Sequence, residues 1–240
     1  MAEESKPSIL NQEEMQTAGL HFGHRVSRLH PKMKPYVSGI KNNVHILDLE
    51  KTAKEFAKAL TFISNTIADN KTILFVGTKI QIRESVKSTA QACQMPFVVE
   101  RWLGGTFTNF ETISKRVQYY KDLENKKLTG ELEKYTKKER LMFDRELESL
   151  KKKFEGIKHM VKLPEVVFIL DIKKDTTCVR EAERKGIKIV GVVDTNIDPT
   201  PVDYPIPAND DAISSIKYIL EKVSETIQSA KPQYPNPNDQ

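Results

Sequence analysis

The chain has 240 residues, of which 38% are hydrophobic and 30% are charged, and its formal net charge is +5. This composition excludes a disordered chain, which would have fewer large apolar residues, and a membrane protein, which would have less charge. No apolar stretch reaches the roughly 20 residues that span a bilayer, and the polar N-terminus does not resemble a signal peptide, so we expect a cytoplasmic protein.

A basic arm is predicted at residues 19–43, after a short helix at residues 9–18, and together residues 1–43 form the first segment. The arm has no Asp or Glu, and its glycines and prolines interrupt helices and strands, so we expect an extended loop. Its cations favour an anionic partner such as RNA. They are Arg25, Arg28, Lys32, Lys34 and Lys41, and His24 stands beside them.

Strands and helices alternate from Val44 onward. Apolar runs predict strands at residues 44–49, 71–78, 95–99, 165–171 and 187–194. Helical patterns fall at residues 50–68, 81–92, 178–185 and 211–229. Parallel strands need crossover helices that cover the sheet, so the alternation predicts an α/β domain with an open, doubly wound parallel sheet. This domain takes residues 44–108 and 159–229.

Residues 109–158 form an insertion that does not fit the alternation. Apolar residues step by three and four from Phe110 to Tyr120 and again from Phe143 to Ile157, with a break at residues 128–130. This spacing predicts two helices packed as an antiparallel coiled-coil hairpin. Its charged outer faces, with Lys115 and Arg116 among them, fit either an RNA contact or a solvated surface. Residues 230–240 are rich in Pro and Asn and are predicted to be a disordered tail.

A nucleotide- or phosphate-ester-binding enzyme is the leading alternative function. Gly77 and Lys79 follow a predicted strand, and Asp194 and Asp198 follow another, where ligands bind in such sheets. The GxxxxGK[ST] and GxGxxG motifs are absent, however, and the second loop also suits a turn. We interpret residues 209–211 as a helix N-cap with acidic neighbours.

Metal and cofactor sites are not predicted. His21 and His24 are spaced like ligands, but structural zinc usually takes four ligands in paired clusters. Cys93 and Cys178 both fall in predicted helices, so we expect reduced thiols. Trp102 could stack on a base, but we favour packing of its indole where the hairpin joins the domain.

Several stretches together resemble one known family, that of bacterial small-subunit ribosomal protein number two. The matching stretches are HFGHR at 21–25, PKMKPY at 31–36, ILFVGTK at 73–79, RWLGGTFTN at 101–109, LPEVVFILD at 163–171, VDTNIDP at 193–199 and IPANDDA at 206–212. The resemblance runs from about residue 8 to residue 229. It implies a flavodoxin-like domain with a protruding coiled-coil hairpin, in a ribosome-bound structural protein that is not an enzyme. It also implies small-subunit rRNA and the large mRNA-binding ribosomal protein number one as partners.

We therefore predict that the arm and the hairpin hold two separate surfaces of the RNA, chiefly through phosphate groups. The predicted RNA-binding residues are His24, Arg25, Arg28, Lys32, Lys34, Lys41, Lys79, Arg101, Lys115 and Arg116. A protein–protein adaptor that works through the hairpin is a second alternative.

Overall fold

The structure is a computed structural model, and residues 10–231 are described. The predicted tail at 230–240 lies almost entirely outside these residues. Within the described range, both cysteines are buried and free. No helix among these residues combines the length and the apolar character needed to cross a membrane.

Five parallel strands form the central sheet, in the order β5-β4-β6-β7-β8. The strands are β4 (Ile73–Val76), β5 (Phe97–Val98), β6 (Val166–Ile169), β7 (Lys188–Val193) and β8 (Tyr204–Pro207). Counted from β4, this order is 2-1-3-4-5, which is also the strand order of flavodoxin-like sheets. Every residue of β4 and β6 is buried, as expected for strands that are covered on both faces.

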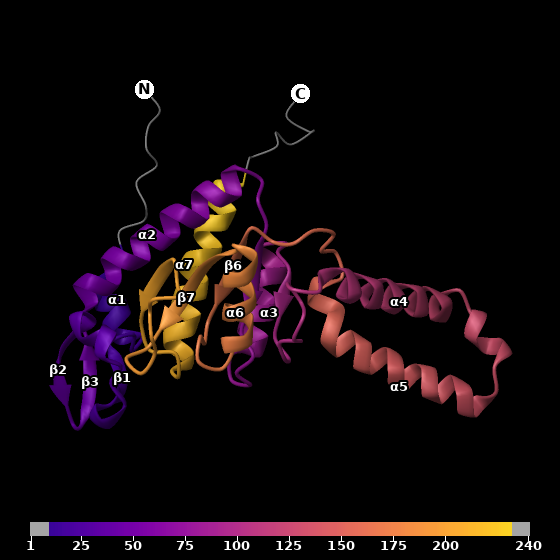
Figure 1. Cartoon of the computed structure of the whole chain (residues 1–240), viewed down its shortest axis with the longest axis horizontal. Coiled ribbons are helices and arrows are strands. Elements are labelled where there is room, and N and C mark those ends of the chain that lie inside the picture. The colour runs from indigo at the N-terminus through magenta and orange to yellow at the C-terminus, as the bar shows by residue number, and fades with distance from the viewer. Residues whose placement is uncertain (1–9, 232–240) are drawn as a thin grey trace.

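Helices cover both faces of this sheet. α2 (Leu49–Ala68), α3 (Arg83–Ala92) and α7 (Ile213–Ala230) form one layer, in which α2 packs on α7 and β8, and α3 packs on α7. α6 (Thr176–Lys185) contributes to the opposite face (Figure 1). Successive strand residues point to opposite faces of the sheet. Phe75 therefore packs in the core beneath α2, α3 and α7, and Leu74 packs in the core beneath α6.

The prediction that residues 44–49 begin the parallel sheet is wrong. β3 (Val44–Leu47) lies between β1 (Phe22–Arg25) and β2 (Val37–Lys41) in a separate antiparallel sheet. Asn42 and Asn43 have φ values of 50° and 62°, and such a pair forms the tight turn of a β-hairpin. The arm is therefore more regular than the predicted loop, because two of its segments are strands.

Two 3-10 helices, η1 (Val26–Arg28) and η2 (Pro31–Tyr36), complete the arm after α1 (Gln12–Thr17). The fifth parallel strand is β8, which was not predicted. Its residues Pro205 and Pro207 lack backbone donors, and proline in a sheet is tolerated at an edge, which is where β8 lies.

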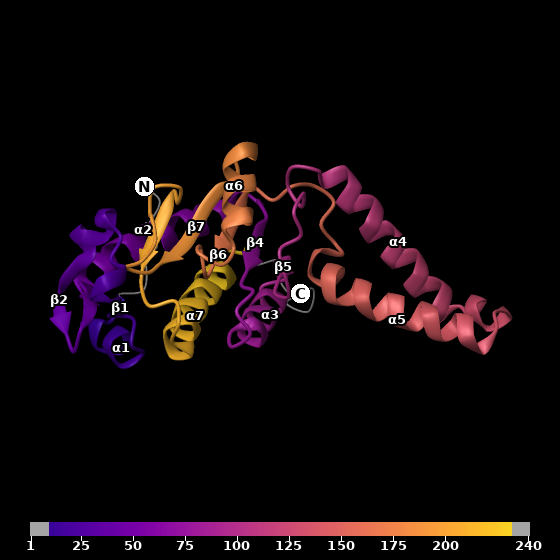
Figure 2. The same cartoon turned by 60° about the horizontal axis from the view of Figure 1, so that its bottom comes forward.

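The insertion contains α4 (Phe110–Leu128) and α5 (Lys137–Phe154), joined through η3 (Glu131–Lys134). α4 is followed by Gly130, whose φ of 76° suits glycine, and α5 starts with a capping box between Thr136 and Glu139. Figures 1 and 2 show the pair extending from one end of the molecule, while the antiparallel sheet lies at the other end. The coiled-coil packing of the two helices stays a prediction.

Candidate nucleic-acid interface

Four arm cations are exposed on the antiparallel sheet and its 3-10 helices. Arg25 ends β1, Arg28 ends η1 and Lys41 ends β2, while Lys34 lies within η2. None of the four has a carboxylate oxygen within 4.0 Å in residues 10–231. The structure therefore brings these predicted residues together as a group of free positive charges.

Lys32 is also exposed, but its charge is already paired. Its Nζ lies 2.9 Å from a carboxylate oxygen of Asp198 and 2.6 Å from the hydroxyl of Thr200. Hydrogen bonds from Thr200 and Lys32 hold the pKa of Asp198 well below its usual range. Lys32 thus ties η2 to the loop after β7, and a phosphate would have to compete for it.

Lys79 lies apart from the arm, in a cluster of carboxylates at the carboxyl ends of the parallel strands. Its Nζ lies 3.0 Å from Asp171, 2.9 Å from Asp210 and 2.8 Å from Asp211. Burial alone would lower the pKa of Lys79. The negative charge of Asp210, together with the hydrogen bonds that Lys79 donates to Asp211 and Asp210, raises this pKa instead. The geometry does not favour a phosphate contact, because the ammonium is surrounded by the protein's own anions.

His24 joins the same group of charges. Its Nδ1 lies 3.0 Å from Asp194 and its Nε2 lies 3.5 Å from Asp211. The hydrogen bond with Asp194 raises the pKa of His24 above its ordinary value. The ring is thus held between carboxylates, which does not favour the predicted contact with RNA.

One set of side chains in this region has the geometry of metal ligands. His24, Asp194 and Asp210 each offer one ligand atom, and these atoms lie within 4.8 Å of one another. A nitrogen and two carboxylate oxygens suit a zinc-like ion. This set does not contain His21, so it differs from the spacing considered in the sequence, and the predicted absence of a metal stays a prediction.

The interpretation of residues 209–211 as the N-cap of the last helix is wrong. α7 begins at Ile213, its N-cap is Ala212, and no side chain caps it. Asn209 instead accepts hydrogen bonds from the backbone nitrogens of Asp211 and Ala212 in the preceding turn. The two aspartates are used to hold Lys79.

The loop after β4 does not form the phosphate cradle that an enzyme would need. The hydroxyl of Thr78 donates to Asp175 across 3.0 Å, and α3 begins only at Arg83. With Lys79 also bound to carboxylates, the hydroxyl and the ammonium group of this loop are both engaged by the protein itself. The geometry thus counts against the enzyme alternative.

The loop that enters the helical pair is packed, as predicted for Trp102. The indole is 7% exposed and meets the ring of Phe107 edge to face, with centroids 4.7 Å apart. Beside it Arg101 is exposed. On α4, Lys115 and Arg116 are exposed as well, but Lys115 pairs with Glu111 across 2.7 Å, as a solvated helical face would.

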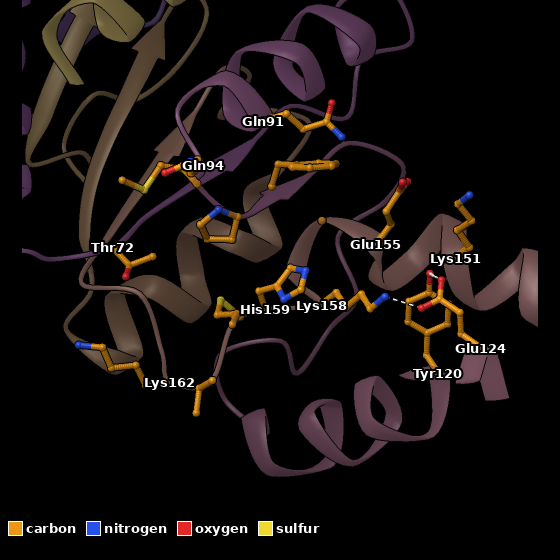
Figure 3. A pocket seen from close by; sticks show the side chains of 16 residues that line it. Thr72, Gln91, Gln94, Tyr120, Glu124, Lys151, Glu155, Lys158, His159 and Lys162 are labelled. Atoms are coloured by element: carbon orange, nitrogen blue, oxygen red, sulfur yellow. Dashed lines mark hydrogen bonds and ion pairs between the residues drawn. The ribbon is translucent and has the colours of Figure 1, made fainter. Parts of the chain in front are cut away.

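Two hollows at the base of α5 were not predicted. The larger has a volume of about 780 Å³, and Figure 3 shows Lys151, Lys158 and His159 among its lining residues, with Lys158 paired to Glu124. The smaller, of about 290 Å³, lies between α3 and α5 and is rich in Lys and Arg. The sequence signal for the hollows is the run of three lysines, Lys151 to Lys153, near the end of the second helix of the insertion.

Comparison with known proteins agrees with this architecture. Residues 15–230 match the family described as Ribosomal protein S2. Proteins named Small ribosomal subunit protein uS2 are similar to the chain. The one from Coprothermobacter proteolyticus is 42% identical over 92% of this chain and 82% of its own length. The one from Wolinella succinogenes is 42% identical over 93% of this chain and 82% of its own length. The one from Geotalea uraniireducens is 44% identical over 92% of this chain and 86% of its own length. The chain therefore belongs to the ribosomal protein S2 family.

Proposed function

We propose that the chain is held on small-subunit rRNA at two separated surfaces, the arm cations and the α4–α5 helical pair. As a member of the S2 family it is a structural constituent of the small ribosomal subunit in translation and not an enzyme. The observation that carries the proposal is the group of free, exposed cations Arg25, Arg28, Lys34 and Lys41. It lies at the opposite end of the molecule from the helical pair (Figure 2).

The parallel sheet acts in this proposal as a rigid spacer between the two RNA surfaces. Contacts to phosphate groups position a protein without reading base sequence, so the folded shape of the RNA supplies the specificity. A spacer with a strand core buried on both faces keeps the distance between the surfaces constant, which suits recognition of shape.

We also propose that α4 and α5 pack as an antiparallel coiled coil. Val117, Tyr120 and Leu123 are buried on α4, and Leu147 and Leu150 of α5 pack against the core that contains Val117 and Tyr120. Lys127 of α4 also pairs with Asp144 of α5 across 2.7 Å. An apolar seam with charged pairs beside it is the usual arrangement of such helices.

The family resemblance further supports the large mRNA-binding ribosomal protein number one as a neighbour, and a ribosome-bound location in the cytoplasm. An adaptor role through the helical pair is compatible with RNA binding, because the two surfaces need not overlap. Capture of that neighbour by the purified chain after nuclease treatment would support the adaptor role. Capture that requires intact RNA would assign the association to the RNA alone.

Binding of the purified chain to small-subunit rRNA at several salt concentrations tests the RNA proposal. The variant R25Q/R28Q/K34Q/K41Q removes the free arm cations, and K54Q/R184Q/K185Q/K217Q removes four exposed charges from α2, α6 and α7. Each lost phosphate contact lowers the slope of log affinity against log salt by about 0.7–0.9, so we expect a drop of about 3–4 for the arm variant and no drop for the control. An unchanged slope for the arm variant would contradict the assignment.

A further inference from the structure

The smaller hollow at the base of the helical pair is lined by more cations than carboxylates. It lies between α3, the segment after β5 and the last turns of α5. Its lining contains six cationic side chains and four carboxylates. The cations are Arg83, Lys87, Arg101, Lys151, Lys152 and Lys153, and the carboxylates are Glu84, Glu100, Glu148 and Glu155.

Half of these cations are neutralised by carboxylates of the same cleft. Arg83 pairs with Glu100 across 2.6 Å, and Lys87 pairs with Glu155 across 3.1 Å. Lys152 pairs with Glu148 one turn earlier on α5, at 2.9 Å. These three pairs fix the walls of the cleft and use most of its negative charge.

The other three cations, Arg101, Lys151 and Lys153, are exposed. Within residues 10–231 none of them has a carboxylate oxygen within 4.0 Å. They come from two segments, since Arg101 follows β5 and the lysines lie near the end of α5. Like charges at this spacing repel one another, and an anionic ligand would relieve that repulsion.

Two backbone segments of the cleft are packed closely where η4 (Glu155–Ile157) meets β5. A Cβ atom built on Gly156 would lie 2.0 Å from the carbonyl oxygen of Phe97, so only glycine allows η4 to approach β5 this closely. The larger hollow in Figure 3 shares Phe97, Lys151, Glu155 and Gly156 with the cleft. Lys151 therefore borders both hollows.

We propose that the surface of the helical pair meets the RNA in this cleft, where Arg101, Lys151 and Lys153 contact phosphodiester groups of the RNA backbone. The inference rests on the proposed function. The planar guanidinium of arginine can donate two parallel hydrogen bonds to a phosphate, and lysine binds it as a point charge. Because these contacts lie where the helical pair meets the sheet, they fix the pair to the RNA at its root.

Salt-dependent binding of the full chain to small-subunit rRNA tests the proposal with two variants of equal charge change. R101Q/K151Q/K153Q removes the free cations of the cleft, while K54Q/K185Q/K217Q removes three exposed lysines from α2, α6 and α7. We expect the slope of log affinity against log salt to fall by about two to three units for the cleft variant and to stay unchanged for the control. Equal slopes for the two variants would overturn the proposal.

The arm variant separates this inference from the proposed function. A reduced slope for the arm variant with a normal slope for the cleft variant would reject only the cleft, whereas no binding by the unaltered chain would reject both. A second measurement uses cleavage of the RNA by an iron chelate tethered to a single new cysteine, since Cys93 and Cys178 are buried. Glu84→Cys at the cleft should cut the RNA backbone and Lys217→Cys should not, and cuts from neither position would overturn the proposal.

Discussion

The carboxylate of Glu181 on α6 accepts a hydrogen bond from the indole nitrogen of Trp102 across 3.2 Å. The same carboxylate accepts hydrogen bonds from the backbone nitrogens of Gly105, Phe107 and Thr108, at 2.8, 2.9 and 3.1 Å. Burial alone would raise the pKa of Glu181, but these hydrogen bonds lower it below its ordinary value. One side chain thus holds the loop through which the chain enters α4.

Replacement of Glu181 should therefore destabilise the fold. Glu181→Ala leaves several donors without an acceptor, two of them on buried residues, and we expect the free energy of unfolding to fall by about 2–4 kcal/mol. Glu183→Ala on the same helix removes an exposed carboxylate and should change it by less than about 0.5 kcal/mol. Urea unfolding checks both variants. A similar loss for the two would show that Glu181 does not hold the loop.

Gly156 should be sensitive to the addition of one methyl group. Since a Cβ atom would meet the backbone of Phe97, Gly156→Ala must move η4, and we expect a loss of about 1–3 kcal/mol in the free energy of unfolding. Gly104→Ala is the matched control, because no atom lies within 4 Å of its Cβ position. Thermal unfolding of both variants at one pH measures the difference. Equal midpoints would contradict the close approach of η4 and β5.

Lys79 should contribute to stability and not to RNA binding. Lys79→Gln leaves Asp171 and Asp210 buried without their counter-ion, and breaking such a pair costs about 3–5 kcal/mol. We expect a large loss in urea unfolding, whereas Lys185→Gln should have almost no effect. The opposite result, with normal stability and a reduced salt slope in RNA binding, would assign Lys79 to the RNA interface.

Asp175 should make stability depend on pH. Burial raises the pKa of Asp175 from 3.8 to about 6. The folded state thus binds this proton more firmly than the unfolded state, so the free energy of unfolding falls as pH rises from about 4 through about 6.

Asp175→Asn removes the titration but keeps an oxygen that can accept the hydrogen bond from Thr78. Relative to the unaltered chain, the variant should gain about 1–3 kcal/mol between pH 4 and pH 7.5. Urea unfolding at the two pH values measures this gain, with Asp122→Asn as the exposed control. A constant difference at both pH values would rule out the raised pKa.

The interior of the parallel sheet was predictable because its strands are continuous apolar runs. The predicted strands around Ile73–Val76 and Val166–Ile169 were both found, as was the helix Leu49–Ala68. The edges were less predictable. A strand with two prolines, such as Tyr204–Pro207, is acceptable only because it lies at an edge, and the sequence does not reveal that position. The Asn42–Asn43 pair was a signal for the antiparallel hairpin that could have been used.

The exposed cations of the candidate interface could be predicted from the sequence. Cations that pair with carboxylates far away in the sequence could not. Arg28 and Lys34 lie in a segment without acidic residues, so no local partner could neutralise them. Lys79 is paired with Asp210, which lies 131 positions further along the chain. Only the fold brings them together, so the sequence alone presented Lys79 as a free cation.

Sedimentation of the tagged full chain from a bacterial lysate, with ribosomal subunits dissociated and resolved on a sucrose gradient, tests the central claim most directly. We expect the chain to migrate with the small subunit in equal amount at low salt. High salt should release the chain, and the variant R25Q/R28Q/K34Q/K41Q should be released at lower salt, because phosphate contacts supply the binding. A folded chain that stays at the top of the gradient even at low salt would contradict a structural role in the small subunit.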